Sequence, residues 1–533
     1  AIEPILNNNV KNIFTFCLAY INGFIVIMIM KKIITIDNLT EKLKILKQKK
    51  QKIGLCHGVF DLIHIGHLRH FNEAKKKVDF LVLSITADKY VNKGFGRPYF
   101  NENQRLEFAS CIEYIDAVVL SNDHSSENVI SMIKPSFYFK GSDYKNNKKD
   151  ITGKIKKEKQ LVEKYKGKII YTDEIVFSSS SLINKFNSPF NKIQNFFLKK
   201  LKQRYSVDVI LSYLKSIYDQ KVVIIGESII DKYVYCDVLG KSGKEPYLAY
   251  KRKNEDIFLG GSLAVANQIY QFNKKITLIT NIKKNSAEEN FIKKKLPKEI
   301  KIKCLVSHHN NIVKTRYLEK VSNIKVFGCY DIDDLVYSDN EKKKSVKILN
   351  QIIPNKDLLI ICDYGHGLIN SEISSKISKM KIKKSLNTQL NAANVGSHNF
   401  QKYKNINFMI INEAELRYEM KDNITRLDFL ARKLIKKINI KDLVVTSGSK
   451  GAILVSKSNK KYYCPAFANS FVDKVGAGDS MLSILSLCLN TGVPRDIALF
   501  FGSIMASISV NIVANKRPIK FEEMYKSVET ILK

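Results

Sequence analysis

Two histidines that are three positions apart mark the most chemically informative segment of the chain. Residues 64–67 (His-Ile-Gly-His) follow an apolar strand candidate and the segment 58–61 (Gly-Val-Phe-Asp), and the pattern of 68–77 predicts a helix. At a helix N-terminus the main-chain N–H groups and the helix dipole attract phosphate, the glycine lets it approach, and the imidazoles donate hydrogen bonds. Four of the nine histidines lie between His57 and His70, which favours a phosphate site over scattered surface histidines.

The elements around this motif alternate short apolar strands with amphipathic helices. From residue 30 to about 188 we predict strands over 53–56, 80–86, 117–120, 137–140 and 168–171, and helices over 65–77, 102–110 and 126–133. Such alternation indicates βαβ units and a parallel sheet, and therefore an α/β fold.

The order strand, G-x-F-D, H-x-G-H resembles the nucleotidylyltransferase superfamily. The matching residues are Gly58, Phe60, Asp61, His64, Gly66 and His67. The resemblance implies a Rossmann-like domain in which a substrate phosphate oxygen attacks the α-phosphorus of a nucleoside triphosphate and pyrophosphate leaves. Positioning and charge stabilisation then do most of the catalytic work. His64 and His67 would stabilise the α-phosphate as negative charge develops.

Three further segments resemble parts of the same family. Residues 93–105 are similar to its mobile basic loop and following helix, so Lys93, Arg97 and Arg105 would reach triphosphate oxygens. Residues 134–143 are similar to its K-P-D-x-x-x-K-G-x-D-Y segment, with serine in place of the acidic residue. The turn 177–181 resembles its serine-rich helix start; phosphate-holding hydroxyls there would come from Ser179, Ser180 and Ser181. Taken alone, these stretches would be a solvated charged loop and a helix N-cap.

A second group of motifs lies in the C-terminal part of the chain. Residues 472–480 (Val-Asp-Lys-Val-Gly-Ala-Gly-Asp-Ser) precede an apolar helix predicted over 481–489. Consecutive N–H groups of Gly476, Ala477 and Gly478 can form an anion hole, and Asp479 can take a proton from a substrate hydroxyl. Taken alone, G-A-G-D is a weak signal and could be only a helix-entry turn.

Other segments of 221–533 resemble the ribokinase-like (PfkB) carbohydrate kinases. The resemblance implies an α/β domain with a small β lid. It implies sugar binding by Asp231, Gly260, Gly261, Asn267 and Arg316, and nucleotide binding by Asn412, Glu415, Thr446, Gly448 and Gly451. ATP and Mg²⁺ are the implied cofactors, with Glu415 linked to the metal indirectly. Several positions depart from the family pattern, namely Glu227, His366, Lys474 and 391–396, where comparable heptose kinases have D-P-K-G. These departures leave the identity of the sugar open.

The two domains together resemble the bifunctional heptose 7-phosphate kinase / heptose 1-phosphate adenylyltransferase family, in which the kinase comes first. Here we expect an extension over 1–29, the transferase over 30–188, a linker over 189–218 and the kinase over 219–533. The resemblance implies ATP-dependent phosphorylation of a sugar's anomeric hydroxyl and then nucleotidyl transfer, giving ADP-heptose or a similar nucleotide sugar for lipopolysaccharide. Alternatives are a cytidylyltransferase fused to a kinase for another sugar, a binding or regulatory protein with one dead domain, and a basic nucleic-acid-binding protein.

Composition bears on partners and compartment. The net charge of +37 over 533 residues invites a nucleic-acid interpretation, but the basic residues are spread along a chain rich in Lys, Asn and Ile, so we expect no specific nucleic acid. The nine cysteines form no C-x-x-C pair, which suits a reducing cytoplasm. Residues 13–30 carry no charge and are just long enough to span a bilayer, although we prefer an extension outside the functional fold. The expected partners are substrate sugar phosphates, nucleoside triphosphates and a second copy of the chain.

Overall fold

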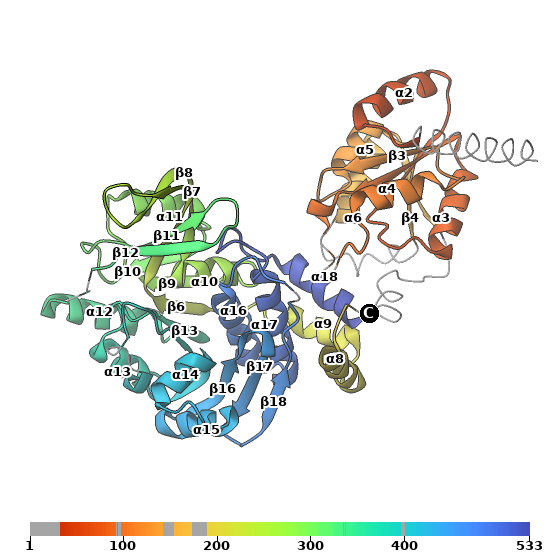
Figure 1. Cartoon of the computed structure of the whole chain (residues 1–533). Coiled ribbons are helices and arrows are strands. Elements are labelled where there is room, and N and C mark those ends of the chain that lie inside the picture. The colour runs from red at the N-terminus through yellow and green to blue at the C-terminus, as the bar shows by residue number, and fades with distance from the viewer. Residues whose placement is uncertain are drawn as a thin grey trace, which may run out of the picture. The chain divides into compact units, whose positions relative to one another are not determined.

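The computed structural model describes residues 32–91, 93, 97–141, 154–172, 189–333, 335, 337–395, 400–468 and 470–533. The chain forms two compact units (Figure 1): unit 1 comprises 1–189 with Lys533, and unit 2 comprises 190–532. The expected extension 1–29 and the serines at 179–181 lie outside the described residues. Within the described ranges, no helix is both long enough and apolar enough to cross a membrane.

Unit 1 has a parallel sheet flanked by helices, as predicted. Its described strands form one five-stranded sheet in the order β3-β2-β1-β4-β5: β1 (Ile53–Gly58), β2 (Phe80–Thr86), β3 (Ala117–Ser121), β4 (Phe137–Gly141) and β5 (Lys168–Thr172). Its helices are α2 (Ile36–Gln48), α3 (Ile65–Lys75), α4 (Glu102–Ser110), α5 (Glu127–Ile133) and α6 (Lys154–Lys164), and a 3-10 turn η1 covers Asp88–Tyr90. The strand order reverses between β1 and β4, and in such sheets ligands bind in the crevice beyond the carboxyl ends of these strands.

Alternating side chains of the central strands fill two separate cores of unit 1. On β1, Ile53 and Leu55 belong to one buried apolar cluster and Cys56 to the other. On β2, Val82 belongs to the first cluster and Leu83 to the second. Because successive strand residues point to opposite faces, the sheet is buried on both sides. This burial fixes the strand ends that carry the histidine motif.

Unit 2 contains a larger sheet with helices around it. Its described strands form a nine-stranded sheet in the order β10-β9-β6-β13-β14-β15-β16-β17-β18, in which β17 is antiparallel to both of its neighbours and the other neighbouring pairs are parallel. The strands are β6 (Val222–Gly226), β9 (Ile276–Thr280), β10 (Lys301–Cys304), β13 (Leu358–Asp363), β14 (Lys383–Thr388), β15 (Ile406–Asn412), β16 (Ile440–Thr446), β17 (Ala452–Ser456) and β18 (Lys461–Cys464). Helices are α10 (Gly261–Tyr270), α11 (Ala287–Lys295), α12 (Asp339–Ile352), α13 (Ser371–Lys379), α14 (Glu413–Met420), α15 (Leu427–Ile438), α16 (Ala477–Asn490), α17 (Arg495–Ser509) and α18 (Phe521–Leu532), with 3-10 turns η4 (Phe400–Lys402) and η5 (Gly448–Lys450).

A smaller sheet lies at one end of unit 2 and matches the expected β lid (Figure 1). It has the order β12-β11-β7-β8 and contains β7 (Ser228–Lys241), β8 (Leu248–Gly260), β11 (Ile312–Glu319) and β12 (Lys325–Asp331). The pairs β7–β8 and β11–β12 are antiparallel, whereas β7 and β11 are parallel. All residues of β12 are exposed, so this sheet is covered far less than the nine-stranded one.

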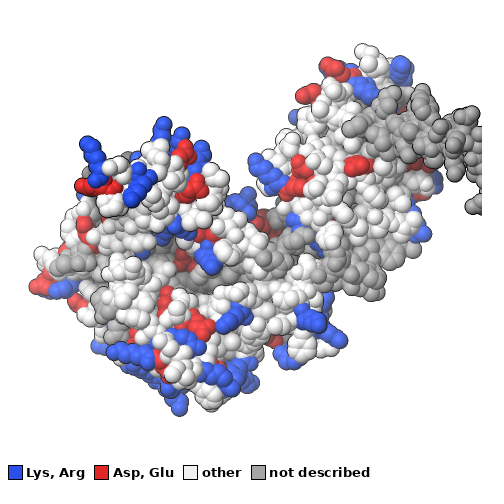
Figure 2. All heavy atoms as spheres, viewed as in Figure 1, with Lys and Arg blue, Asp and Glu red and all other residues white. Residues whose placement is uncertain are grey.

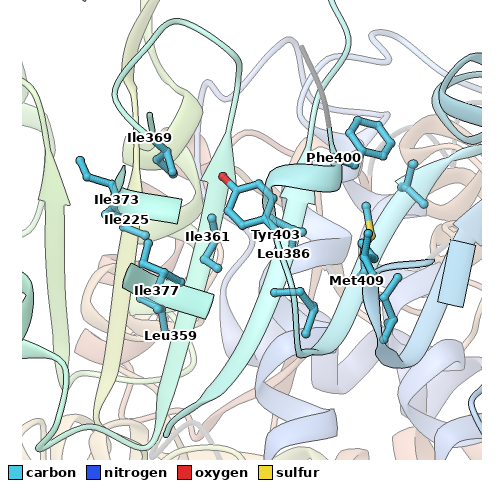
Figure 3. Close-up of a cluster of buried hydrophobic side chains, with 14 of the residues drawn as sticks. Ile225, Leu359, Ile361, Ile369, Ile373, Ile377, Leu386, Phe400, Tyr403 and Met409 are labelled. Atoms are coloured by element: carbon cyan, nitrogen blue, oxygen red, sulfur yellow. The ribbon is translucent and has the colours of Figure 1, made fainter. Parts of the chain in front are cut away.

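One face of the nine-stranded sheet carries the main apolar cluster of unit 2 (Figure 3). Ile225, Ile361, Leu386 and Met409 come from four adjacent strands and are buried together with Tyr403, which follows η4. Such a core holds the carboxyl ends of β6, β13, β15 and β16 at fixed positions, and the predicted nucleotide-binding residues at 412–415 and 446–451 lie at or just after the ends of β15 and β16.

Residues 190–218 form two helices of unit 2, α8 (Lys192–Arg204) and α9 (Val207–Ser216), where the sequence suggested a connecting linker. Gln194 donates its side-chain N–H to the carbonyl of Ala466 at 2.6 Å. The ring of Phe197 lies 6.2 Å from that of Phe467. The hydrogen bond and the ring contact make residues 190–218 part of the body of unit 2.

Candidate active sites

The histidine motif forms a hydrogen-bonded helix cap at the end of β1. His64 is the N-cap residue of α3, and its Nδ1 accepts the N–H of Gly66 at 3.1 Å. Nδ1 of His67 accepts the N–H of His64 at 3.3 Å, and the two ring centroids are 4.0 Å apart. Because each Nδ1 accepts a main-chain proton, the neutral rings carry their own proton on Nε2. Both Nε2 atoms are therefore set up as hydrogen-bond donors.

Burial keeps His67 neutral. Burial is the largest cause that lowers the pKa of His67, and electrostatic interactions with His64, Lys93 and His70 add to it, bringing the pKa to about 3. Lys93 of the basic segment is thus close enough to act on His67. A neutral donor can stabilise charge on a phosphate without titrating near neutral pH.

The aromatic residue of the G-x-F-D segment supports these rings. The Phe60 ring meets His67 edge-on, with centroids 5.5 Å apart, and it also contacts Phe71 of α3. A Cβ at Gly58 would lie 3.1 Å from the Phe60 ring, which explains the small residue at that position. Gly58 and Phe60 therefore shape the site through packing.

Asp61 fixes the segment that follows the basic loop. Its Oδ1 accepts the N–H of Tyr99 at 2.6 Å and that of Phe100 at 3.0 Å. Nη1 of Arg97 lies 3.5 Å from the Asp61 Oδ2, and both side chains are only 2% exposed. Asp61 and Arg97 thus hold the entry to α4 beside the β1–α3 loop.

Arg105, which was expected to reach phosphate, is hydrogen-bonded to protein groups in this structure. The side chain is 1% exposed, and its guanidinium donates to the carbonyls of Phe100, Val59 and Thr86 at 3.0, 2.6 and 2.9 Å. It also pairs with Asp88 at 2.5 Å. A cation with these partners ties α4 to the ends of β1 and β2, so its role here is structural.

In unit 2, the G-A-G-D motif starts helix α16. Gly476 is the N-cap with φ 87°, and a Cβ there would lie 2.3 Å from the Asn515 Oδ1, so only glycine fits. Ala477, Gly478 and Asp479 form the first turn, whose N–H groups have no partner within a helix and can hold an anion. Asp479 Oδ1 accepts a hydrogen bond from the Tyr364 hydroxyl at 2.8 Å.

Two opposing sets of neighbours tune Asp479. Burial and the negative charge of Asp231 raise its pKa, whereas the Tyr364 hydrogen bond and the positive charge of Lys314 lower it, and the result is about 6. Such a carboxylate is ionised at neutral pH yet basic enough to accept a proton from a hydroxyl.

The predicted sugar-binding residues surround the same place. Asp231 pairs with Arg316 across β7 and β11 at 2.5 Å. A Cβ at Gly260 would lie 2.4 Å from the Asp231 Oδ2, and one at Gly261 would lie 2.6 Å from the Glu227 carbonyl, so the glycine pair is a steric requirement. Asn267 of α10 and Asp479 line one small cavity.

The predicted nucleotide-binding residues lie at the ends of β15 and β16. Asn412 pairs in register with Thr446, and Asn412 forms a capping box with Glu415 at the start of α14. The carboxylate of Glu415 also accepts the N–H of Leu390 at 3.3 Å, and burial raises its pKa to about 7. Since both oxygens accept main-chain N–H groups, contact with a metal through water fits better than direct ligation. Among the described residues, no group of three or more His, Cys, Asp or Glu side chains could hold a metal ion.

The two glycines after β16 shape a tight turn. Gly448 begins η5 with φ 56°, and Gly451 ends it with φ 93°. A Cβ at Gly451 would lie 2.2 Å from the carbonyl of Cys464, on β18. Packing therefore requires glycine at 451, and the backbone conformation favours glycine at 448. Both requirements are independent of any nucleotide.

Sequence reasoning missed two residues that act on Asp479, Tyr364 and Lys314, and a third, Glu227, that holds the segment of Tyr364, although it had marked their segments. Tyr364 contacts the carboxylate directly. Lys314 is buried, and burial lowers its pKa. Glu227 is fully buried and accepts the N–H groups of Tyr364 and His366, and burial together with Asp363 raises its pKa to about 7. The motifs were visible in the sequence, but which of their side chains reach Asp479 depends on the sheet order.

Comparisons with known proteins agree with the two units. The pfkB family carbohydrate kinase profile matches 219–514, and the cytidylyltransferase-like profile matches 55–186. The Bifunctional protein HldE of Campylobacter jejuni subsp. doylei is 33% identical over 150 residues, 27% of this chain and 30% of that protein. The Bifunctional protein HldE of Aliarcobacter butzleri is 36% identical over 121 residues, 22% of this chain and 25% of that protein. This chain thus spans less than a third of the length of these relatives. The crystal structure of ribokinase from Thermotoga maritima aligns with a TM-score of 0.46 and 20% identity, covering 57% of this chain and 98% of that one.

The larger profile match extends over more than half of the 533 residues and includes Asp231, the glycine pair and Asp479. The smaller match includes the histidine motif and the sheet of unit 1. Both descriptions are those of group-transferring enzymes. The chain is therefore a transferase that belongs to the pfkB family of carbohydrate kinases and carries a nucleotidyltransferase domain ahead of the kinase.

Proposed function

We propose that this chain makes a nucleotide-activated sugar in two steps. The kinase domain, which we assign to 219–533, phosphorylates the anomeric hydroxyl of a sugar phosphate with ATP. The transferase domain, which we assign to 30–188, joins the resulting sugar 1-phosphate to a nucleotide and releases pyrophosphate. The observation that supports the proposal is that one chain holds a carboxylate, Asp479, in the first turn of α16 and, separately, two histidines at the start of α3 whose Nδ1 atoms accept main-chain N–H groups.

In the first step, the acceptor hydroxyl gives its proton to Asp479 as its oxygen bonds to the γ-phosphorus of ATP. The bond from that phosphorus to the bridging oxygen breaks, and ADP leaves. The N–H groups of Ala477 and Gly478 stabilise the charge that develops on the transferred group. Asp231 and Arg316 hold sugar hydroxyls. Mg²⁺ would arrive with the nucleotide and offset the charge of its phosphates.

In the second step, a phosphate oxygen of the sugar 1-phosphate attacks the α-phosphorus of a nucleoside triphosphate. The bond from the α-phosphorus to the bridging oxygen of pyrophosphate breaks. The Nε2–H groups of His64 and His67 donate to the α-phosphate oxygens, where negative charge increases. Lys93, which lies near His67, would face the leaving pyrophosphate.

For the substrate we propose heptose 7-phosphate and, for the transferase, ATP. The two steps then give ADP-heptose 7-phosphate, and hydrolysis of the 7-phosphate by a separate phosphatase, before or after nucleotidyl transfer, gives ADP-heptose. The similarity to the two HldE proteins supports this choice over part of the chain. The cytidylyltransferase-like profile keeps a second candidate open, in which CTP is the nucleotide. The loop 391–395 departs from the pattern of heptose kinases. Its side chains form hydrogen bonds to the main-chain carbonyl of Tyr364, and these contacts do not indicate which sugar is bound.

The setting we propose is the cytoplasm. The cysteines that the structure describes are all free thiols, which suits a reducing compartment. Figure 2 shows basic side chains spread over the visible face and interspersed with acidic ones, without one continuous basic stripe. That distribution favours an enzyme over a nucleic-acid-binding protein.

The function is tested by incubating the purified full-length chain with ATP, with CTP, and with a panel of sugar phosphates that includes heptose 7-phosphate. Products are identified by mass. The proposal expects a sugar bisphosphate from ATP and a nucleotide-linked sugar when a nucleotide for the second step is present. A chain that converts no sugar phosphate, or that binds duplex DNA tightly with a steep dependence on salt, would contradict it.

A further inference from the structure

Tyr364 connects the catalytic base to the core of unit 2. It directly follows β13, its side chain is 3% exposed, and its hydroxyl donates to the Asp479 Oδ1 at 2.8 Å. Asp479 itself belongs to α16, more than a hundred residues further along the chain. A single hydrogen bond therefore joins the end of a central strand to the base at the start of a helix.

The main chain of Tyr364 is held from two other segments. Its N–H donates to the Glu227 Oε2 at 3.0 Å, next to the end of β6. Its carbonyl accepts the side-chain N–H groups of Asn391 at 2.8 Å and of Asn394 at 3.0 Å. These contacts leave the backbone at this position little freedom, so the location of the hydroxyl is set before a substrate binds.

We propose that Tyr364 is a positioning residue for phosphoryl transfer, whose hydroxyl occupies Oδ1 of Asp479 and leaves Oδ2 to accept the proton of the sugar hydroxyl. The inference rests on the proposed role of Asp479 as the base. It also assigns a task to the two asparagines of the divergent 391–395 loop, which fix the carbonyl of Tyr364.

The competing explanation is that a buried tyrosine hydroxyl only needs an acceptor, as buried hydroxyls generally do. The same unit contains a pair that fits this explanation. The Tyr403 hydroxyl donates to the Asp363 Oδ2 at 2.6 Å within the apolar cluster of Figure 3, and it does not contact Asp479. Tyr364→Phe and Tyr403→Phe therefore remove similar hydrogen bonds from two carboxylates, only one of which is the proposed base.

The two variants are compared through the pH dependence of kcat/KM for sugar phosphorylation by the full chain. Removing a donor from an ionised carboxylate raises its pKa. Tyr364→Phe should therefore move the acid limb, the part of the profile where kcat/KM falls as the pH is lowered, to higher pH by about one unit. Below the limb this corresponds to about a tenfold loss of kcat/KM relative to wild type. The other groups that act electrostatically with Asp479 are unchanged in this variant; they are Asp231 of β7, Lys314 of β11, Cys362 of β13 and Glu415 of α14. Tyr403→Phe should keep the limb in place.

The melting temperatures of both variants, measured by thermal unfolding, show whether Tyr364 only stabilises the fold. Equal limbs in wild type and Tyr364→Phe, with only the melting temperature lowered, would overturn the inference while leaving the proposed kinase activity intact. Sugar phosphorylation that persists in the Asp479→Asn variant would overturn the proposed function and this inference together. A shifted limb in Tyr364→Phe and not in Tyr403→Phe supports the positioning role.

Discussion

The two activities of this chain are expected to respond differently to acid. In the proposed mechanism sugar phosphorylation needs Asp479 as the ionised carboxylate, and burial raises the pKa of this group to about 6. Lowering the pH through that value protonates the base. With a single ionisation, about one carboxylate in ten remains ionised one unit below the pKa. At pH 5 the kinase kcat/KM should therefore be about a tenth of its neutral plateau.

Nucleotidyl transfer should keep its rate over the same range. Burial and neighbouring positive charges lower the pKa of His67 to about 3, so the ring stays neutral at pH 5. Its Nδ1 then still accepts the N–H of His64, and its Nε2 still donates. An ordinary surface histidine would gain a proton as the pH falls through about 6.5, whereas His67 would gain one only near pH 3.

Initial rates of ADP and pyrophosphate formation, measured from pH 5 to 8 at constant ionic strength, check both statements. The secondary ionisation of the sugar phosphate, near pH 6, is measured separately by phosphorus NMR and applied as a correction to both profiles. The reasoning is refuted by a kinase profile that stays level down to pH 5, or by a transferase profile with a midpoint near 6.5.

Two substitutions test the structural assignments. Arg105→Gln should destabilise unit 1 by about 3–5 kcal/mol, because three main-chain carbonyls, at least one of them buried, and Asp88 lose a charged donor. Urea unfolding followed by far-UV circular dichroism measures this, and a variant of unchanged stability that fails only to bind nucleotide would support the phosphate role instead. Gly260→Ala places a methyl group 2.4 Å from the Asp231 Oδ2, so the kinase KM for sugar should rise at least tenfold while nucleotidyl transfer is unchanged; equal sugar affinity in the two proteins would show that Asp231 does not need this space.

Much of the fold follows from local patterns in the sequence. The strand over 80–86 was predicted with its observed bounds because all of its residues are apolar or small and all are buried. The helix over 102–110 also has its predicted bounds, and the structure shows that Asn101 and Gln104 form a capping box at its start. Such cues lie within a few residues of one another, and so they are visible without tertiary structure.

Other features depend on contacts between distant segments. The sequence of 190–218 shows helical spacing, but only the contact of Phe197 with Phe467 shows which body it joins. Arg105 has the charge of a phosphate ligand, yet carbonyls from β1 and β2 surround it. The hydrogen-bond partner of Asp479 could not be predicted either. Tyr364 follows β13 and Asp479 lies in α16, and only the tertiary structure brings these distant segments together.

The central claim is that two separate sites act in succession on one sugar. Its most direct test incubates wild type, His67→Ala and Asp479→Asn, each shown to be folded by circular dichroism, with ATP and heptose 7-phosphate, followed by mass analysis of the products. Wild type should yield ADP-heptose 7-phosphate or its dephosphorylated form after phosphatase treatment, and His67→Ala should stop at the sugar bisphosphate. Asp479→Asn should form neither from heptose 7-phosphate but should still convert supplied sugar 1-phosphate. Loss of both reactions in either folded variant, or the same product pattern in all three proteins, would contradict the two-site account.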